Sequence, residues 1–440
     1  MSPIISIIGI VIGLALMIGL SFKGVSIYLY APISAVVVML FGGLPVWATL
    51  TGPYMEGFVG YAKNYFLLFA MASMYAKIMG DSGAAQVIAV TLTNAAKKAK
   101  KNKELVAMLS LHVVTLLLTY GGINLFVVTF LMASIAKTMY EELDIPWHLY
   151  NASAWASGTI TMTMLPGSPA AQNLIPMQYL GTDAKAAPLL GILSAIICVV
   201  LELGYIVYVQ RRCKKKGEGF LPTGAVIAER IKEVDLKDTD ITIVKALIPS
   251  IVLLIVLNFF KLPSVLVALL VGIVLAVILY WKNIPNVLQS LTQGVEQSIG
   301  VTISVCAVVG FGSVVAVTPG YAAVIAGLDH VPGGPLVQLL IAVNVCAGFA
   351  GSASGGLAIG LNSFAQKFLD MGINPQLIHR VSAIASGGLD SLPHNGAVNS
   401  GLRIAGLTHK QAYIHTFIEC TIIPLIVSIF TLLMAMAGIC

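Results

Sequence analysis

The ionisable residues that could do chemistry in this chain lie within or beside interruptions of long apolar runs. Asp390 and His394 flank one interruption, and His112 lies in an apolar run of the first half. Burying an ionisable group in a membrane is expensive, so such groups are candidates for function. Because histidine exchanges a proton near neutral pH, we predict proton coupling through these three residues, with hydrogen-bonded structural roles as the alternative. Glu202 and Glu419 lie nearer the ends of apolar runs, where their side chains could reach the membrane interface, so they rank below these three residues.

Small polar residues gather at four interruptions, at residues 120–124, 165–169, 351–356 and 392–396. An interrupted helix leaves free N–H groups and the positive end of a helix dipole, which suit a small anion such as a carboxylate. Glycine lets the backbone approach a ligand closely, and Ser, Thr and Asn add hydrogen bonds. Tight helix packing through small residues is the structural alternative. The predicted substrate-binding residues are Gly121, Gly122, Asn124, Thr163, Gly167, Ser168, Gly351, Ser352, Ser354, Gly355, His394 and Asn395.

The four interruptions occur at corresponding points of two sequence repeats. A shift of 229 residues places Ser134 on Ser363 and Pro146 on Pro375, whereas the two Leu-Pro pairs are offset from that register by two residues. Helices broken by Pro and Gly at equivalent points of two repeats are the best sequence indicator of a secondary transporter's binding site.

The composition predicts an all-α polytopic membrane protein that is embedded in a lipid bilayer. Of the 440 residues, 58% are hydrophobic and only 10% are charged, against about a quarter in soluble proteins. Runs 3–20, 25–41, 246–260 and 265–281 carry no charge and approach the roughly 20 residues that cross a bilayer. The first run lacks the features of a cleavable signal peptide. The net charge of +6 does not indicate a nucleic-acid partner, and the six cysteines have no CxxC spacing that would indicate a metal site or a disulfide framework.

These elements must be arranged so that the interruptions meet. We expect N-terminal transmembrane helices at 1–42, a first repeat at 43–210, a linker at 211–240, a transmembrane helix pair at 241–283 and a second repeat at 284–440. The linker holds 14 of the 44 charged residues and starts with a basic cluster, which places it in the cytoplasm and both termini outside. The chain then has about ten full spans and two re-entrant hairpins, and an odd number of crossings per half inverts the second repeat.

Three motifs make the chain similar to a known family. The segments TMTMLPGSPAAQN at 161–173, GGINLFVV at 121–128 and GLDSLPHNGAV at 388–398 resemble the gluconate-permease (GntP) family of the ion-transporter superfamily, and most closely its hydroxybutyrate or short-chain hydroxy-acid branch. The resemblance implies proton-coupled symport of a small organic anion across the inner cell membrane, a homodimer and an elevator movement. The interruption at residues 392–396 departs from that of gluconate carriers, which favours a shorter hydroxy or keto acid.

The sequence therefore predicts an elevator-type secondary transporter of a small organic monocarboxylate, such as 3-hydroxybutyrate, coupled to H⁺ and without a cofactor. The alternatives are a gluconate or other sugar-acid symporter, a Na⁺-coupled carboxylate carrier with oxygen ligands at the interruptions, and a cation/proton antiporter that uses Asp390. An enzyme is disfavoured and no catalytic residue is predicted, because the chain has neither HExxH nor a nucleophile elbow. A channel fits paired broken helices less well than a carrier.

Overall fold

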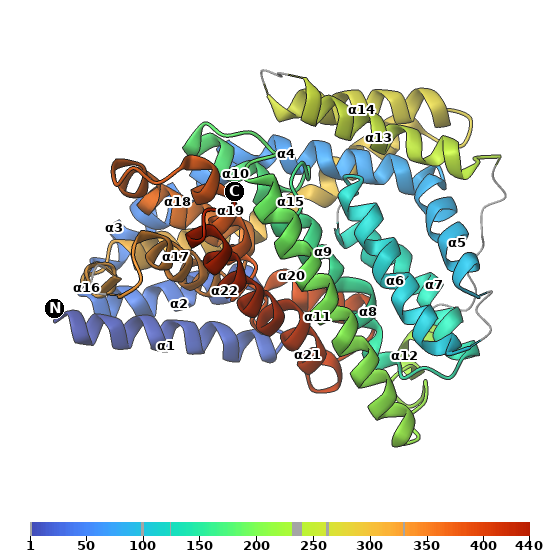
Figure 1. The fold of residues 1–440 in the computed structure, drawn as a ribbon. Coiled ribbons are helices and arrows are strands. Elements are labelled where there is room, and N and C mark those ends of the chain that lie inside the picture. The colour runs from blue at the N-terminus through green and yellow to red at the C-terminus, as the bar shows by residue number, and fades with distance from the viewer. Residues whose placement is uncertain (1, 98–100, 124, 231–239, 261–263, 329–330) are drawn as a thin grey trace.

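The computed structural model describes residues 2–97, 101–123, 125–230, 240–260, 264–328 and 331–440. Within these ranges every regular element is helical, which confirms the predicted all-α fold (Figure 1). In this part of the chain five helical segments are long and apolar enough to cross a membrane, and four shorter apolar helices accompany them. The five long segments are α1 (Pro3–Phe22), α6 (Lys103–Tyr120), α11 (Pro188–Lys215), α15 (Val287–Ala316) and the run from α21 (His409–Phe417) to α22 (Ile423–Met436).

Proline and glycine set many of the helix boundaries. Proline is the first residue of α1, α11, α17 (Pro335–Ala350) and α19 (Pro375–Ser386). Its missing N–H costs nothing in a first helical turn, and its fixed φ suits a helix. A glycine in the left-handed conformation follows α2 (Ile27–Gly42), α10 (Ala171–Leu180) and α17, where a side chain with a Cβ would be strained.

Two long helices, α4 (Met55–Asp81) and α15, pack against each other. Glycines let their backbones approach. A Cβ at Gly57 would lie 2.0 Å from Ser313 Oγ, and a Cβ at Gly294 would lie 2.7 Å from Met74 Cα. Small residues have this role in membrane helix pairs, because the lipid supplies no hydrophobic drive for association.

Both predicted hairpins and both predicted broken helices are present. In the first half, α6 pairs with α7 (Leu125–Glu142), and the first broken helix ends at a π-helical turn (Ile160–Met164) before α10 restarts it. In the second half, α17 pairs with α18 (Ala353–Asp370), and residues 387–395 separate α19 from α20 (Gly396–Ile404). The order of elements is the same in the two halves, while the inversion of the second repeat and the domain boundaries stay predictions.

The remaining elements complete the chain. They are α3 (Val46–Thr49), a π-helical turn (Leu50–Tyr54), α5 (Ala84–Lys97), a 3-10 turn η2 (Trp147–Leu149), α8 (Tyr150–Trp155), α9 (Ser157–Thr159), α12 (Ala225–Arg230), α13 (Ile243–Phe259), α14 (Val265–Tyr280), α16 (Pro319–Leu328) and a second π-helical turn (Ile418–Ile422).

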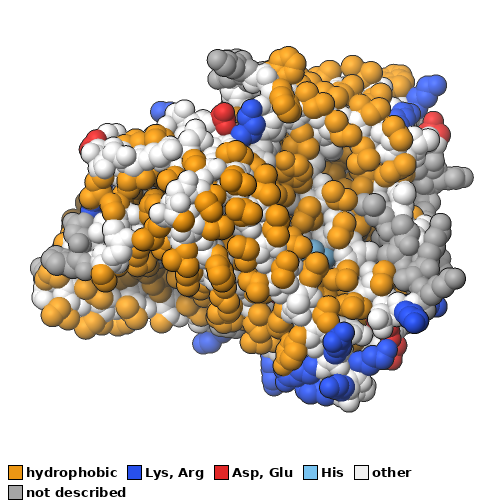
Figure 2. Space-filling model, in the orientation of Figure 1, with side chains coloured by type: hydrophobic (Ala, Val, Ile, Leu, Met, Phe, Trp, Pro, Cys, Tyr) orange, Lys and Arg blue, Asp and Glu red, His pale blue; other side chains and the backbone are white. Residues whose placement is uncertain are grey.

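The surface is that of a multi-pass membrane protein. Figure 2 shows apolar side chains over most of one face and Lys and Arg side chains gathered at the end of the molecule where α11 ends. Along α11, Leu189, Ile196, Val200 and Tyr208 are exposed, as expected of a helix that faces lipid. The helix then continues to Lys215, so the basic start of the predicted linker is helical.

One buried arginine joins the two halves. Arg380 on α19 is fully buried, and its guanidinium donates to Ala186 O at 2.8 and 3.0 Å and to Asn173 Oδ1 at 3.0 Å. Both acceptors belong to the first half, in α10 and in the turn before α11. Because a buried cation is costly unless its N–H groups are bonded, this contact requires both halves to be in place.

Candidate functional site

A cavity of about 1190 Å³ lies where the four predicted interruptions meet. Gly122 and Ile123 line it from the first hairpin, and residues 169–172 line it from the first broken helix. Residues 351–354 line it from the second hairpin, and residues 390–391 and 395–398 from the second broken helix. Segments that are far apart in the sequence therefore form one site.

Four helices begin at this cavity. Leu125, Ala171, Ala353 and Gly396, which are the first residues of α7, α10, α18 and α20, all line it. The first N–H groups of a helix have no partner within the helix, and the aligned peptide dipoles place a positive partial charge there. Four such ends around one cavity favour an anion.

Two predicted binding residues hold helix ends in place. Ser352 Oγ accepts a hydrogen bond from Gly355 N at 3.3 Å, and Asn395 Oδ1 accepts one from Val398 N at 2.9 Å. The Asn395 amide also donates to Asp390 O at 2.8 Å. These are N-caps, which fix the direction of the helix start. The N-cap of α10 is Ala170, and no side chain among the described residues caps that helix, so a ligand carboxylate would find free N–H groups there.

The two ionisable candidates at the second broken helix, Asp390 and His394, differ in their access to the cavity. Asp390 lines the cavity and accepts a hydrogen bond from Ser391 Oγ at 3.1 Å. His394 is buried behind the cavity wall, with its ring against Gly351, and neither ring nitrogen has a hydrogen-bond partner in the described part of the chain. Its backbone oxygen accepts from Tyr30 OH at 3.0 Å. The geometry thus brings Asp390, and not the His394 ring, into reach of a ligand.

A second buried group surrounds His112. Its Nε2 lies 3.2 Å from Glu202 Oε2, although the two are not aligned for a hydrogen bond. Glu202 and Glu419 are both fully buried, so the prediction that their side chains reach the interface was wrong. At 1.5 Å per residue, Glu202 is about 13 Å along α11 from Arg211, beyond the reach of a glutamate, and that spacing was the available signal. Neither Glu419 oxygen has a hydrogen-bond partner among the described residues.

The remaining predicted site residues divide into three groups. Gly122, Gly351, Ser352, Ser354 and Asn395 line the cavity. Asn124 lies outside the described residues. The rest are not among the residues that line the cavity: Gly121 lies beside Ser250, Thr163 is hydrogen-bonded to Thr159 O, Gly167 O to Asn258, Ser168 Oγ to Ala170 N, and Gly355 N to Ser352 Oγ.

Two arginines that the sequence analysis did not single out also line the cavity. Arg230 of α12 and Arg403 of α20 are exposed, and Arg230 Nη1 donates to Arg403 O at 2.9 Å. Because both are exposed, the cavity reaches the protein surface beside them, at Arg230 of the predicted linker. Two cations at the opening of a cavity raise the local concentration of an anion.

The chain is similar to known transporters. Residues 14–438 match the model of CitMHS, described as a citrate transporter family. The chain is 30% identical over 449 residues to the uncharacterized transporter YxjC of Bacillus subtilis, with 92% of this chain and 93% of the relative covered. Among solved structures it is similar to the Alcanivorax borkumensis YdaH transporter, with a TM-score of 0.45, 15% identity and 88% of each chain covered.

Proposed function

The chain belongs to the CitMHS family of transporters, in the same superfamily as the gluconate permeases, and we propose that it carries a small organic carboxylate across the cell membrane together with protons. The family and the relative are transporters, so the protein is a membrane transporter and not an enzyme. The finer resemblance to the hydroxy-acid branch of the gluconate permeases enters here as a hypothesis about the substrate.

The convergence of four helix N-termini on one cavity is the observation that carries the proposal. A carboxylate placed there would accept hydrogen bonds from main-chain N–H groups of α10, which no side chain among the described residues caps. The hydroxyl group of a hydroxy acid would bond to the Ser352 or Ser354 hydroxyl, which both line the cavity. A neutral or cationic substrate would gain nothing from this arrangement.

The substrate we propose is a short monocarboxylate such as 3-hydroxybutyrate, with citrate as the alternative that the family description suggests. Arg230 and Arg403 are the only cationic side chains among the described residues that line the cavity, and both lie at its opening. Helix ends alone suit one negative charge, whereas the three carboxylates of citrate would need further cations deeper in the site.

Asp390 is the proposed proton carrier. Its carboxylate shares the cavity with the proposed substrate carboxylate, so a deprotonated Asp390 repels the substrate and a protonated one does not. Binding of the proton and binding of the anion therefore favour each other, and this coupling is reciprocal. The elevator movement, the homodimer and a Na⁺-coupled variant remain proposals that rest on the family resemblance.

The test is uptake of radiolabelled 3-hydroxybutyrate and citrate into proteoliposomes under an imposed pH gradient, a sodium gradient or neither. We expect 3-hydroxybutyrate to accumulate with the pH gradient and a protonophore to abolish that accumulation. Asp390→Asn should lose gradient-driven accumulation while retaining exchange of labelled for unlabelled substrate. Accumulation of citrate alone would identify citrate as the substrate instead of 3-hydroxybutyrate, and sodium-driven uptake would identify Na⁺ as the coupling ion instead of H⁺. Gradient-driven accumulation by the Asp390→Asn variant would refute the role of this residue.

A further inference from the structure

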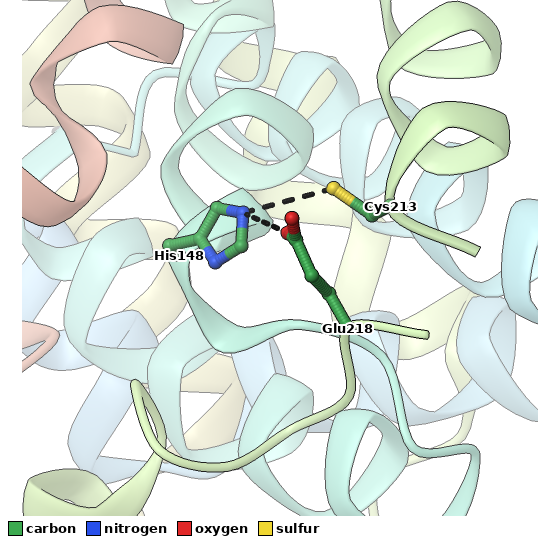
Figure 3. A group of neighbouring side chains, drawn as sticks. All are labelled: His148, Cys213 and Glu218. Atoms are coloured by element: carbon green, nitrogen blue, oxygen red, sulfur yellow. Dashed lines mark hydrogen bonds and ion pairs between the residues drawn. The ribbon is translucent and has the colours of Figure 1, made fainter. Parts of the chain in front are cut away.

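A histidine, a cysteine and a glutamate from three segments meet away from the central cavity (Figure 3). His148 Nε2 lies 3.8 Å from Cys213 Sγ and 3.6 Å from Glu218 Oε2, and the three possible ligand atoms lie within 4.8 Å of one another. His148 belongs to η2, Cys213 to the end of α11 and Glu218 to the turn that follows α11. We propose that these three side chains bind a divalent metal ion of the zinc class.

The distances fit such an ion. Zinc bonds of about 2.0–2.1 Å to nitrogen, 2.0–2.2 Å to oxygen and 2.3 Å to sulfur separate tetrahedral ligands by about 3.4 Å for N and O and about 3.6 Å for pairs with sulfur. Both His148 separations are therefore within about 0.3 Å of a zinc tetrahedron. The third separation is that between Cys213 Sγ and the Glu218 carboxylate. A rotation of the half-exposed Glu218 side chain toward Cys213 would shorten it.

The types of the three donors select the metal. Thiolate and imidazole are the ligands of zinc and its neighbours, whereas Mg²⁺ and Ca²⁺ take oxygen ligands almost exclusively. One imidazole, one thiolate and one carboxylate leave a fourth tetrahedral position for water on the exposed side of Glu218. Lys216 Nζ contacts Glu218 Oε1 at 3.5 Å, so the oxygen that faces His148 stays available.

A helix-ending turn holds two of the ligands in place. Glu218 N donates to Cys213 O at 3.1 Å and Gly217 N donates to Lys214 O at 3.2 Å, with Gly217 at φ +67°. This pair of bonds is a Schellman motif, which ends α11 and returns the chain over its last turn. Cys213 and Glu218 are thus brought together by the backbone before any metal binds.

The third ligand is held by contacts on both sides. His148 N donates to Thr223 Oγ1 at 3.2 Å, and the His148 ring stacks on that of His415 with centroids 5.3 Å apart. Phe220 N donates to Asp144 Oδ1 at 2.8 Å, which ties the turn after α11 to the segment before η2. Ligands that are positioned before binding lose little conformational freedom when the ion arrives.

A bound ion would join two parts of the chain that border the central cavity. His148 lies two residues before the start of α8 in the first broken helix, and Glu218 begins the segment that leads to Arg230 at the cavity opening. The site lies outside the cavity and does not depend on which substrate the protein carries.

The experiment measures metal binding by the full-length protein in detergent, without substrate, after removal of metal by a chelator. We expect one Zn²⁺ per chain, measured by competition with a chromophoric chelator, and a Co²⁺ complex with a thiolate-to-metal charge-transfer band. Cys213→Ser should abolish that band and weaken Zn²⁺ binding at least tenfold, and His148→Gln should weaken it similarly. Cys440→Ser, which removes the exposed cysteine near the C-terminus, is the matched control and should change nothing.

Glu218→Gln keeps the experiment decisive if a buried substitution prevents folding, because Glu218 is at the surface. This variant should elute as the wild type does in size exclusion, bind Co²⁺ with the thiolate band and bind Zn²⁺ more weakly. Absence of stoichiometric Zn²⁺ binding, an unchanged affinity in both Cys213→Ser and Glu218→Gln, or loss of the band in Cys440→Ser would overturn the proposal. The experiment measures metal binding and not transport, so its result does not depend on the proposed transport function.

Discussion

The imidazole ring of His394 occupies the space that a Cβ atom on residue 351 would need. An ideal Cβ at Gly351 would lie 2.4 Å from His394 Cδ2 and 2.6 Å from Nε2, and Gly351 has a φ of +52°. The tip of the second hairpin and the second broken helix are therefore fitted together at one contact directly behind the cavity wall.

Replacing Gly351 with alanine should damage both stability and transport. The left-handed backbone alone costs an alanine about 1–2 kcal/mol, and the clash with the His394 ring adds to this. We expect a lower melting temperature in detergent and a loss of substrate uptake. Gly60→Ala is the control, because a Cβ at Gly60 meets nothing within 4 Å and the residue lies within α4.

The double variant Gly351→Ala/His394→Ala tests the contact itself. If the ring is the obstacle, its removal should restore part of the stability that Gly351→Ala loses, which gives a favourable coupling energy in a double-mutant cycle. Strictly additive losses in melting temperature would mean that the two residues do not interact.

Replacing Asn395 with alanine should weaken substrate binding more than it weakens the fold. The loss of an N-cap costs about 1 kcal/mol, and here it also releases the end of α20 that lines the cavity. Asn374→Ala is the matched control, because Asn374 caps α19 through Gln376 N at 2.9 Å on the protein surface. We expect similar losses of melting temperature, but an increase in KM of about fivefold or more for Asn395→Ala only. An equal KM in the two variants would show that the start of α20 is not part of the substrate-binding site.

Replacing Glu419 with glutamine should make the folded protein more stable. A buried carboxylate without a hydrogen-bond partner among the described residues is costly when charged, and its charge would repel that of Glu202. Glu419→Gln should therefore raise the melting temperature at neutral pH, and it should alter the pH dependence of uptake if the His112–Glu202–Glu419 group carries a proton. Glu104→Gln, whose carboxylate is paired with the exposed Lys214, is the control. A destabilised Glu419→Gln protein would show that the carboxylate has an essential partner.

Arg403 should act by attracting the substrate to the cavity. Neutralising it as Arg403→Gln should lower uptake several-fold at low ionic strength, and the difference from the wild type should shrink as salt is added, because salt screens exposed charges. Arg211→Gln, which removes a similar charge at the end of α11, should have a smaller effect. Uptake by Arg403→Gln that does not depend on salt would contradict electrostatic attraction.

The interruptions were predictable because their causes are local. Gly122 and Gly351 have positive φ and end helices, and proline begins α17 and α19, so hairpins and broken helices follow from residue type alone. The orientation of His394 was not predictable in the same way. It depends on which neighbour packs against the ring, and that neighbour lies on another element.

The buried group around His112 was missed for a related reason. Glu202 and Glu419 lie far apart in the chain, and no sequence motif indicates that the two side chains meet. Likewise His148 and Cys213 are not at a recognisable metal-ligand spacing, because a turn after α11 and not a sequence motif brings them together. Side chains that meet only through packing are beyond what periodicity and spacing can indicate.

The contact of Arg380 with the first half has a consequence for biosynthesis. The acceptor oxygens of Asn173 and Ala186 are synthesised long before Arg380 leaves the ribosome, and α19 then brings a cation into the interior of the protein. Such a helix is poorly suited to insertion on its own, because an unpaired arginine is expensive in lipid. The translocon would therefore have to retain the first half until α19 arrives, and the carrier would become complete only in the last stage of its synthesis.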